Sequence, residues 1–453
     1  MSENKITPVI ILPGIGQSRV VLTDENGAPV KTAWPLDLDA DALLGPLKGP
    51  AMKMMMFRRD AGFSDKVAEV IRTALDPISA KPDGTMKNRL TTVRYPVLSE
   101  CSEDNKRYIN RMVPTVGLTD RIGEENVWFL AYNSFGDPYE TAEELDALIG
   151  KIKAERGCEK VHLLPVSMGA AVATAYFDAY GAKGDVDRAM YMVPALGGSK
   201  VVADLFKEDL EVTELCDILE IFMDAKAGEA LRGFAKIMPA GVAEAVAHKA
   251  LAAVRDTAIR FSPMVWSVVP PECYPALADR WLSGEETAVL RKKTDRFYAA
   301  QSRLRELLDE QRTRGTSFYI CAGYGLPFPP VFGGDACSTD GIINLSCATL
   351  GAKSAAAGQP LPETEIGDPA YVSPDGEVDA SFCYTPETTW FFAKQQHDAI
   401  AYNDTALCVA ARVLCDPDFR DIHSDPALPQ FGKAQDNRKP AAPPQSAAEE
   451  GRD

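Results

Sequence analysis

The chain has 453 residues, of which 46% are hydrophobic and 25% charged, a composition typical of a globular protein with a large buried core. Its net charge of −17 argues against nucleic acid as a partner, because nucleic-acid binding needs a basic face, and against electrostatic docking on an anionic membrane. The sequence contains no apolar run long enough to cross a bilayer, so no stable membrane insertion is expected.

The first part of the chain alternates between strand-like and helix-like segments. Apolar runs that end at turn residues predict strands over 9–12, 126–132, 160–166 and 187–196. Apolar residues at helical spacing predict helices over 139–157 and 168–182. This alternation indicates an α/β fold in which a mostly parallel central sheet is flanked by helices.

The alternation stops after residue 197. Nearly every segment from 198 to 314 has the spacing of a helix, and strands resume over 317–325 and 388–393, before a last helix over 398–414. We therefore expect a core built from residues 1–197 and 315–423 with an inserted helical cap over 198–314. The remainder, 424–453, is rich in proline, alanine and charge and is expected to be disordered.

A serine lies where a strand meets a helix. In HLLPVSMGAAVA the apolar strand ends at Ser167, and small residues follow it. This is typical of the sharp G-x-S-x-G turn that exposes a catalytic nucleophile, although Pro165 stands in place of the first glycine. Proline is tolerated at the end of a strand, so the motif is weakened and not excluded. The alternative interpretation is that Ser167 only caps the following helix.

A nucleophile on this turn needs a base and an acid, which follow it in the order acid, then histidine. His397 lies after the strand 388–393 and directly before the last helix, where a base belongs, and the alternative is a surface-loop histidine. Asp340, in the loop STDGIINLSCATLGA after the preceding strand, is the predicted acid. Asp375 and Asp379 are the alternative acids, and ordinary turn aspartates are the other interpretation of all three.

Backbone N–H groups are expected to complete the site. One comes from Met168, the residue after the candidate nucleophile, and we assign the other to Ile15 in the early loop LPGIGQS, with Gly16 beside it. Such donors bind the negative charge that develops on a substrate oxygen.

These motifs together resemble the α/β-hydrolase lipases and acyltransferases of the lecithin:cholesterol acyltransferase type. The resemblance lies in LPGIGQS, AWPLDLDA, Ser167-Met168-Gly169, the Asp340-Gly341 loop, His397 and RFSPMVWSVVP, and it spans about residues 7 to 415 as separate segments. The chain departs from the family in Pro165-Val166, where Gly-His is usual, and in YNSF, which lacks the usual Asp and Arg. The resemblance implies the α/β-hydrolase fold with an inserted helical cap and ester chemistry on acyl substrates.

We therefore predict a serine hydrolase of carboxylic esters, acting on lipid or other apolar acyl substrates without a cofactor. Ser167, Asp340 and His397 would form its catalytic triad, and Gly16, Met264 and Trp266 would contact the acyl group. An acyltransferase that uses an alcohol acceptor and a catalytically inactive binding protein are the alternatives. The segment AMKMMMFRRD (Ala51 to Asp60) is either a lid or a core helix.

Compartment and metal content follow from simpler features. The start, MSENKITPVIILPG, lacks the pattern of a secretory signal, and the ten cysteines include no C-x-x-C pair. We expect a cytoplasmic protein with reduced thiols and no metal. The oligomeric state stays open.

Overall fold

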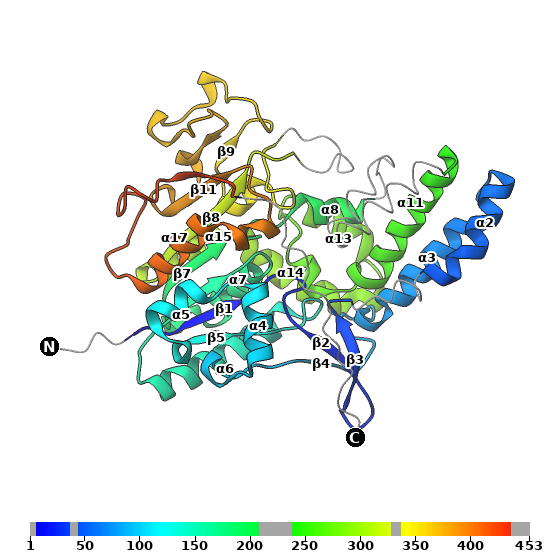
Figure 1. The fold of residues 1–453 in the computed structure, drawn as a ribbon, viewed down its shortest axis with the longest axis horizontal. Coiled ribbons are helices and arrows are strands. Elements are labelled where there is room, and N and C mark those ends of the chain that lie inside the picture. Colours follow the sequence, from blue (N-terminus) through cyan, green and yellow to red (C-terminus); the bar gives the residue numbers. More distant parts are fainter. Residues whose placement is uncertain (1–5, 37–43, 208–237, 328–336, 436–453) are drawn as a thin grey trace.

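A seven-stranded parallel sheet forms the centre of the molecule. The computed structural model describes residues 6–36, 44–207, 238–327 and 337–435. The strand order is β12-β11-β8-β7-β6-β1-β5, and all neighbouring strands are parallel (Figure 1). The strands are β1 (Val9–Leu12), β5 (Val127–Phe129), β6 (Val161–Pro165), β7 (Val186–Met192), β8 (Ser317–Tyr324), β11 (Thr389–Ala393) and β12 (Phe431–Lys433).

Helices cover both faces of this sheet. On β1, Ile10 and Leu12 belong to one hydrophobic core and Val9 and Ile11 to the other, because successive side chains of a strand point to opposite faces. The helices of the first face are α6 (Pro138–Arg156), α7 (Gly169–Tyr180), α14 (Ala288–Ser302) and α15 (Leu304–Thr313); those of the second are α4 (Glu103–Met112), α5 (Val116–Ile122) and α17 (Asp404–Cys415). The predicted α/β fold, with a mostly parallel central sheet flanked by helices, is thereby confirmed.

The longest of these helices illustrates how the sequence sets its ends. Asp137 caps α6, since its carboxylate accepts a hydrogen bond from the N–H of Tyr139 at 2.9 Å. Pro138 occupies the first helical position, where its missing N–H costs nothing. Gly157, with a φ of +60°, ends the helix in the left-handed conformation that glycine adopts most easily.

A helical cap projects from one side of the sheet (Figure 1). It contains α2 (Lys48–Phe57), α3 (Phe63–Leu75), α8 (Lys200–Phe206), α11 (Ala240–Val254), α12 (Pro263–Trp266) and α13 (Tyr274–Trp281). Its composition differs from the predicted segment 198–314 in two ways. Helices α2 and α3 come from the first part of the chain, with α3 packed on α11, while α14 and α15 contact α7 of the core. An apolar stripe predicts a helix but does not say which surface the stripe covers.

The predicted disordered tail begins too early. Residues 424–435 are described, and β12 within them pairs with β11 in the register Phe391–Phe431 to Ala393–Lys433. The prediction was wrong for this segment because three residues of strand gain their hydrogen bonds from β11 and need no apolar run of their own. The part of the predicted tail from 436 onward lies outside the described residues.

Smaller elements complete the fold. An antiparallel sheet joins β2 (Val20–Thr23), β3 (Pro29–Trp34) and β4 (Leu90–Thr92); β9 (Lys353–Ser354) pairs with β10 (Val378–Asp379), and α16 (Leu345–Thr349) follows β8. Within the described ranges, no helix combines the length and the apolar character that a membrane span needs.

Candidate active site

Ser167 occupies a sharp turn between β6 and α7. Its φ is +52°, a left-handed conformation that residues other than glycine rarely adopt. The turn brings the start of α7 against the end of β1, and a Cβ at Gly169 would collide with the carbonyl oxygen of Leu12. Gly14 leaves little room as well, since a Cβ there would lie 3.0 Å from the Cβ of Ser167. The small residues around Ser167 are therefore required by this geometry.

Pro165 is accommodated by a gap in the sheet ladder. The N–H of Ser167 donates to the carbonyl of Met192 on β7 at 3.0 Å, and Pro165, two residues earlier, faces the same strand. Pairing of β6 with β7 ends at Leu163 and continues only as a single bridge between Val166 and Met192. The missing proline N–H thus falls where the ladder is already interrupted, and the turn keeps its shape.

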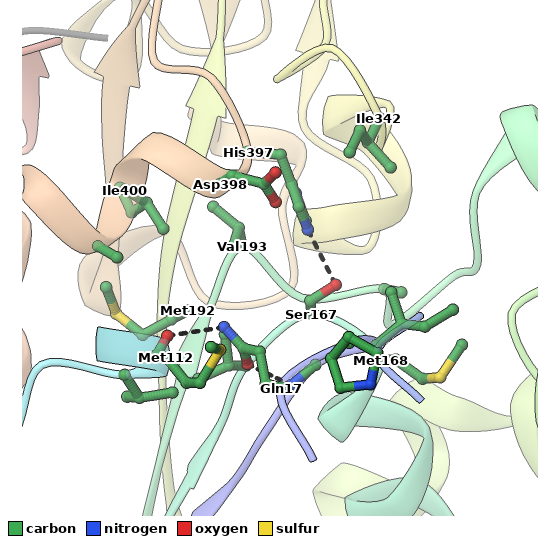
Figure 2. A pocket seen from close by; sticks show the side chains of 18 of the residues that line it. Gln17, Met112, Ser167, Met168, Met192, Val193, Ile342, His397, Asp398 and Ile400 are labelled. Atoms are coloured by element: carbon green, nitrogen blue, oxygen red, sulfur yellow. Dashed lines mark hydrogen bonds between the residues drawn. The ribbon is translucent and has the colours of Figure 1, made fainter. Parts of the chain in front are cut away.

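His397 joins Ser167 to Asp340. The Nε2 of His397 lies 2.9 Å from the Oγ of Ser167 (Figure 2), and its Nδ1 lies 2.7 Å from the Oδ2 of Asp340. A carboxylate only accepts, so Nδ1 carries the ring proton and Nε2 is left to accept one from the serine hydroxyl. Residues far apart in sequence meet here because β6, β8 and β11 are parallel, and their carboxyl ends lie at the same edge of the sheet.

Asp340 is buried and fixed by its own loop. It is 2% exposed, and His397 is 7% exposed. The Oδ1 of Asp340 accepts hydrogen bonds from the N–H groups of Ile342 at 3.0 Å and Ile343 at 2.7 Å. The N–H of His397 donates in turn to the carbonyl of Asp340 at 2.9 Å. Hydrogen bonds of the side chains and of the backbone therefore fix the position of His397 relative to Asp340.

The surroundings of His397 raise its pKa and so stabilise the imidazolium that forms when it takes a proton. Burial alone would lower the pKa of His397, but the charge of Asp340, the hydrogen bond to it and the charge of Asp398 raise the pKa, and the net pKa lies above the ordinary 6.5. His162 behaves in the opposite way, because burial and the charge of Arg188 lower its pKa to about 3. Of these two histidines, only His397 is suited to receive a proton.

The two residues predicted to supply backbone donors line the same cavity. In the described part of the chain, neither the N–H of Ile15 nor that of Met168 donates a hydrogen bond. Both residues line the cavity that contains Ser167, together with Gly16, whose φ is +80°. Two unpaired N–H groups beside a serine hydroxyl can bind an anionic oxygen.

Gln17, which the sequence analysis did not select, holds this loop in shape. Its Oε1 accepts from the N–H of Gly14 at 2.6 Å, and its backbone N–H donates to the carbonyl of Gly14 at 3.2 Å. Its Nε2 donates to the carbonyl of Met112, at the end of α4, at 2.8 Å (Figure 2). The only signal in the sequence is an amide directly after a glycine-rich loop.

A cavity of about 1030 Å³ opens at Ser167. Besides the loops around Ser167, two groups of elements line it, which we call the cap side and the α5–α17 side. The cap side consists of Val70, Ile71, Ala74, Leu75, Val201, Val202, Leu205, Val254, Val265 and Val268, and the α5–α17 side of Val116, Leu118, Arg121, Asp398, Ile400, Asp404, Leu407 and Ala411. The cap side carries no charged residue, whereas Arg121, Asp398 and Asp404 all belong to the α5–α17 side.

Two predicted lining residues do not reach the cavity. Met264 is completely buried in the core, and Trp266 packs in the cap, with its ring 4.3 Å from that of Phe206. The residues that line the cavity from this segment are Val265 and Val268. The prediction was wrong because neighbouring residues of a helix face in different directions, and four consecutive apolar residues do not reveal which one faces the cavity.

The alternative acids, Asp375 and Asp379, form hydrogen bonds with residues other than His397. Asp375 accepts hydrogen bonds from the hydroxyl of Tyr324 at 3.1 Å and from the Oγ of Ser373 at 2.5 Å. Asp379 accepts from the N–H groups of Gly367 and Ser381. The carboxyl group that the structure brings to His397 is that of Asp340.

Comparisons with known proteins add little beyond the fold. No protein-family model matches the chain, and no curated protein sequence matches it. The chain is similar to a chain of the Tle4–Tli4 complex, with 14% identity, 91% of this chain and 98% of that chain covered, and a TM-score of 0.38. It is also similar to the phospholipase PlaB from Legionella pneumophila, with 16% identity, 50% of this chain and 38% of that chain covered, and a TM-score of 0.24. The likeness to lecithin:cholesterol acyltransferases therefore stays a resemblance between motifs.

In the described ranges, His, Cys, Asp and Glu side chains form no group of three or more that could hold a metal ion.

Proposed function

We propose that this chain is a serine hydrolase that cleaves carboxylic esters with an apolar acyl chain. The observation that carries the proposal is the hydrogen-bonded series Ser167–His397–Asp340 at the wall of a large, mainly apolar cavity. A strained, left-handed serine costs folding free energy, which its exposure to a base and to a substrate-sized space would explain.

The reaction would proceed through an acyl-enzyme. His397 takes the proton of Ser167 while the serine Oγ attacks the ester carbonyl, and the N–H groups of Ile15 and Met168 bind the resulting oxyanion. His397 then gives its proton to the departing alkoxide. Water then enters, loses a proton to His397 and bonds to the acyl carbon; the bond between that carbon and the Oγ of Ser167 breaks, the acid leaves, and His397 returns the proton to Ser167. Asp340 keeps the imidazole oriented and stabilises its positive charge throughout.

The two sides of the cavity suggest how the ester is oriented. The cap side offers an apolar surface without charge, which suits an acyl chain. The α5–α17 side adds Arg121, Asp398 and Asp404, which suit the more polar alcohol portion. We therefore assign the acyl chain to the cap side and the alcohol to the α5–α17 side.

A series of p-nitrophenyl esters tests this assignment. We expect kcat/KM to rise about threefold to fourfold for each added CH₂ over the short and medium chain lengths, because each buried CH₂ contributes about 0.8 kcal/mol. The variant Ala74→Phe, which fills part of the cap side, should lose this rise for the longer chains and keep its activity on acetate.

Thr73→Phe is the matched control, because Thr73 precedes Ala74 on α3 and is exposed. It should retain the wild-type profile. A wild-type profile that is flat from acetate onward would contradict an apolar acyl site, and equal losses in both variants would show that the cap side does not hold the chain.

Gln17 gives a second test, because it acts through the loop that carries Ile15. We expect Gln17→Leu to lower kcat by about tenfold to hundredfold with little change in KM, less than the roughly hundredfold to thousandfold loss of an oxyanion donor itself. Gln17→Glu, which keeps the acceptor for Gly14 but not the donor to Met112, should retain part of the activity. A raised KM at unchanged kcat would instead assign Gln17 to substrate binding.

A further inference from the structure

Helix α2 exposes large apolar side chains on its outer face. Met52 is 66% exposed and Met56 is 70% exposed, and Met55 and Phe57 are also exposed. Met54 points the other way and is completely buried against Phe63 and Val242. The helix is therefore anchored by one side, while the opposite side leaves methionines in water, where exposed apolar patches are typical of interaction sites.

Basic residues surround these methionines. On a helix, residues four apart share a face, so Lys48, Met52 and Met56 lie one above the other, and Lys53 lies beside them. Arg58 and Arg59 follow directly, and all four basic side chains are exposed. The only acidic residue over 44–60 is Asp60, whose carboxylate accepts hydrogen bonds from the N–H of Ser64 at 2.7 Å and from its hydroxyl at 2.6 Å.

Residues 44–60 thus contain four basic residues and one acidic residue, whereas the whole chain has a net charge of −17. Figure 1 shows α2 at the outer end of the cap, beyond α3 and away from the sheet. No residue of α2 lines the cavity, and of its residues only Met54 is fully buried.

We propose that α2 docks the protein on an anionic lipid surface. Met52, Met55 and Met56 enter the boundary between headgroups and acyl chains, while Lys48, Lys53, Arg58 and Arg59 bind the negatively charged headgroups. The acidic net charge of the chain does not prevent this binding, because the basic residues are gathered on and directly after α2. These residues are attracted to the anionic surface, while the rest of the protein stays in solvent. The proposal goes beyond ester hydrolysis and does not depend on it.

A second copy of the chain is a poorer occupant of this face. Ten residues of helix are about 15 Å long, which is short for an interface that buries about 800 Å² on each partner. A symmetric dimer would also bring Lys48, Lys53 and Arg58 of two copies together, and like charges across an interface repel.

Vesicle co-sedimentation of the Ser167→Ala protein tests the docking without any contribution from turnover. Vesicles of phosphatidylcholine mixed with phosphatidylglycerol should bind at least about tenfold more tightly than phosphatidylcholine alone, and the difference should shrink as salt is added. Lys48→Gln with Lys53→Gln should weaken binding to the anionic vesicles by about fivefold for each lysine lost. Met52→Ser with Met56→Ser should weaken binding to the anionic vesicles by about tenfold or more.

Val30→Ser and Val289→Ser are matched controls, because each removes an exposed apolar side chain on another element. Both should bind vesicles as the parent protein does. Equal binding to both kinds of vesicle, or unchanged binding in the methionine variant, would overturn the proposal. So would a dimer in solution that the methionine variant converts to a monomer. Failure of ester hydrolysis with intact vesicle binding would overturn only the proposed function.

Discussion

Ser167→Ala is expected to lower kcat by about a million-fold on any ester that the wild-type protein cleaves, as loss of a triad nucleophile does elsewhere. The hydroxyl of Ser167 is the group 2.9 Å from His397, and alanine leaves the imidazole with no proton to remove. Labelling by a fluorophosphonate, which reacts with activated serines, should disappear in the same variant. Single-turnover kinetics and gel-based labelling would measure the two effects.

The exposed serine at position 302 provides the control for this experiment. Ser302→Ala lies on α14, away from the cavity lining, and should keep both activity and labelling. Thermal unfolding should show that Ser167→Ala is folded. Activity of that variant within about tenfold of wild type would remove Ser167 from the mechanism, because a triad nucleophile contributes far more.

Asp340→Asn is expected to lower kcat by about ten-thousand-fold, since an amide that donates to Nδ1 holds the imidazole in the wrong tautomer. The same substitution has a second effect on the pH profile. The carboxylate of Asp340 helps to raise the pKa of His397, so its removal lowers that pKa. The base must be neutral to act, so the acid limb of kcat/KM should move to lower pH in the variant.

Asp375→Asn makes the same chemical change in a neighbouring loop. Asp375 contacts Tyr324 and Ser373, so its loss should leave the pH profile in place and the rate close to that of wild type. If Asp375→Asn lost its activity and Asp340→Asn kept it, the assignment of the acid would be reversed, while the description of the fold would stand.

The strands of the sheet were predictable because a strand buried on both faces is an uninterrupted run of apolar residues in the sequence. All four residues of β1, Val9 to Leu12, are apolar and fully buried, which is what a central parallel strand requires. The order Ser167, Asp340, His397 along the chain was sufficient to nominate three residues, and in the structure Ser167 and Asp340 each lie within hydrogen-bonding distance of His397. Their catalytic roles stay predictions until the variants are measured.

Other features depend on contacts between distant parts of the chain. The role of Gln17 is visible only once Met112, 95 positions away, lies beside it. Met264 and Trp266 are as apolar as Val265 and Val268, and only the packing of α12 decides which pair reaches the cavity. The net charge of −17 also gave no indication of the basic residues on and after α2, since a total over the chain carries no information about position.

Strand β12 sets a practical limit on how short this protein can be made. It covers the outer hydrogen-bonding groups of β11, which would otherwise be an unpaired sheet edge open to aggregation with other chains. The carbonyl of Lys433 also accepts a hydrogen bond from the side chain of Asn403, which in turn donates to Gln395, two residues before His397. An expression boundary placed at residue 423 would therefore expose that edge and loosen the loop of the candidate base together, whereas a boundary after residue 435 preserves both.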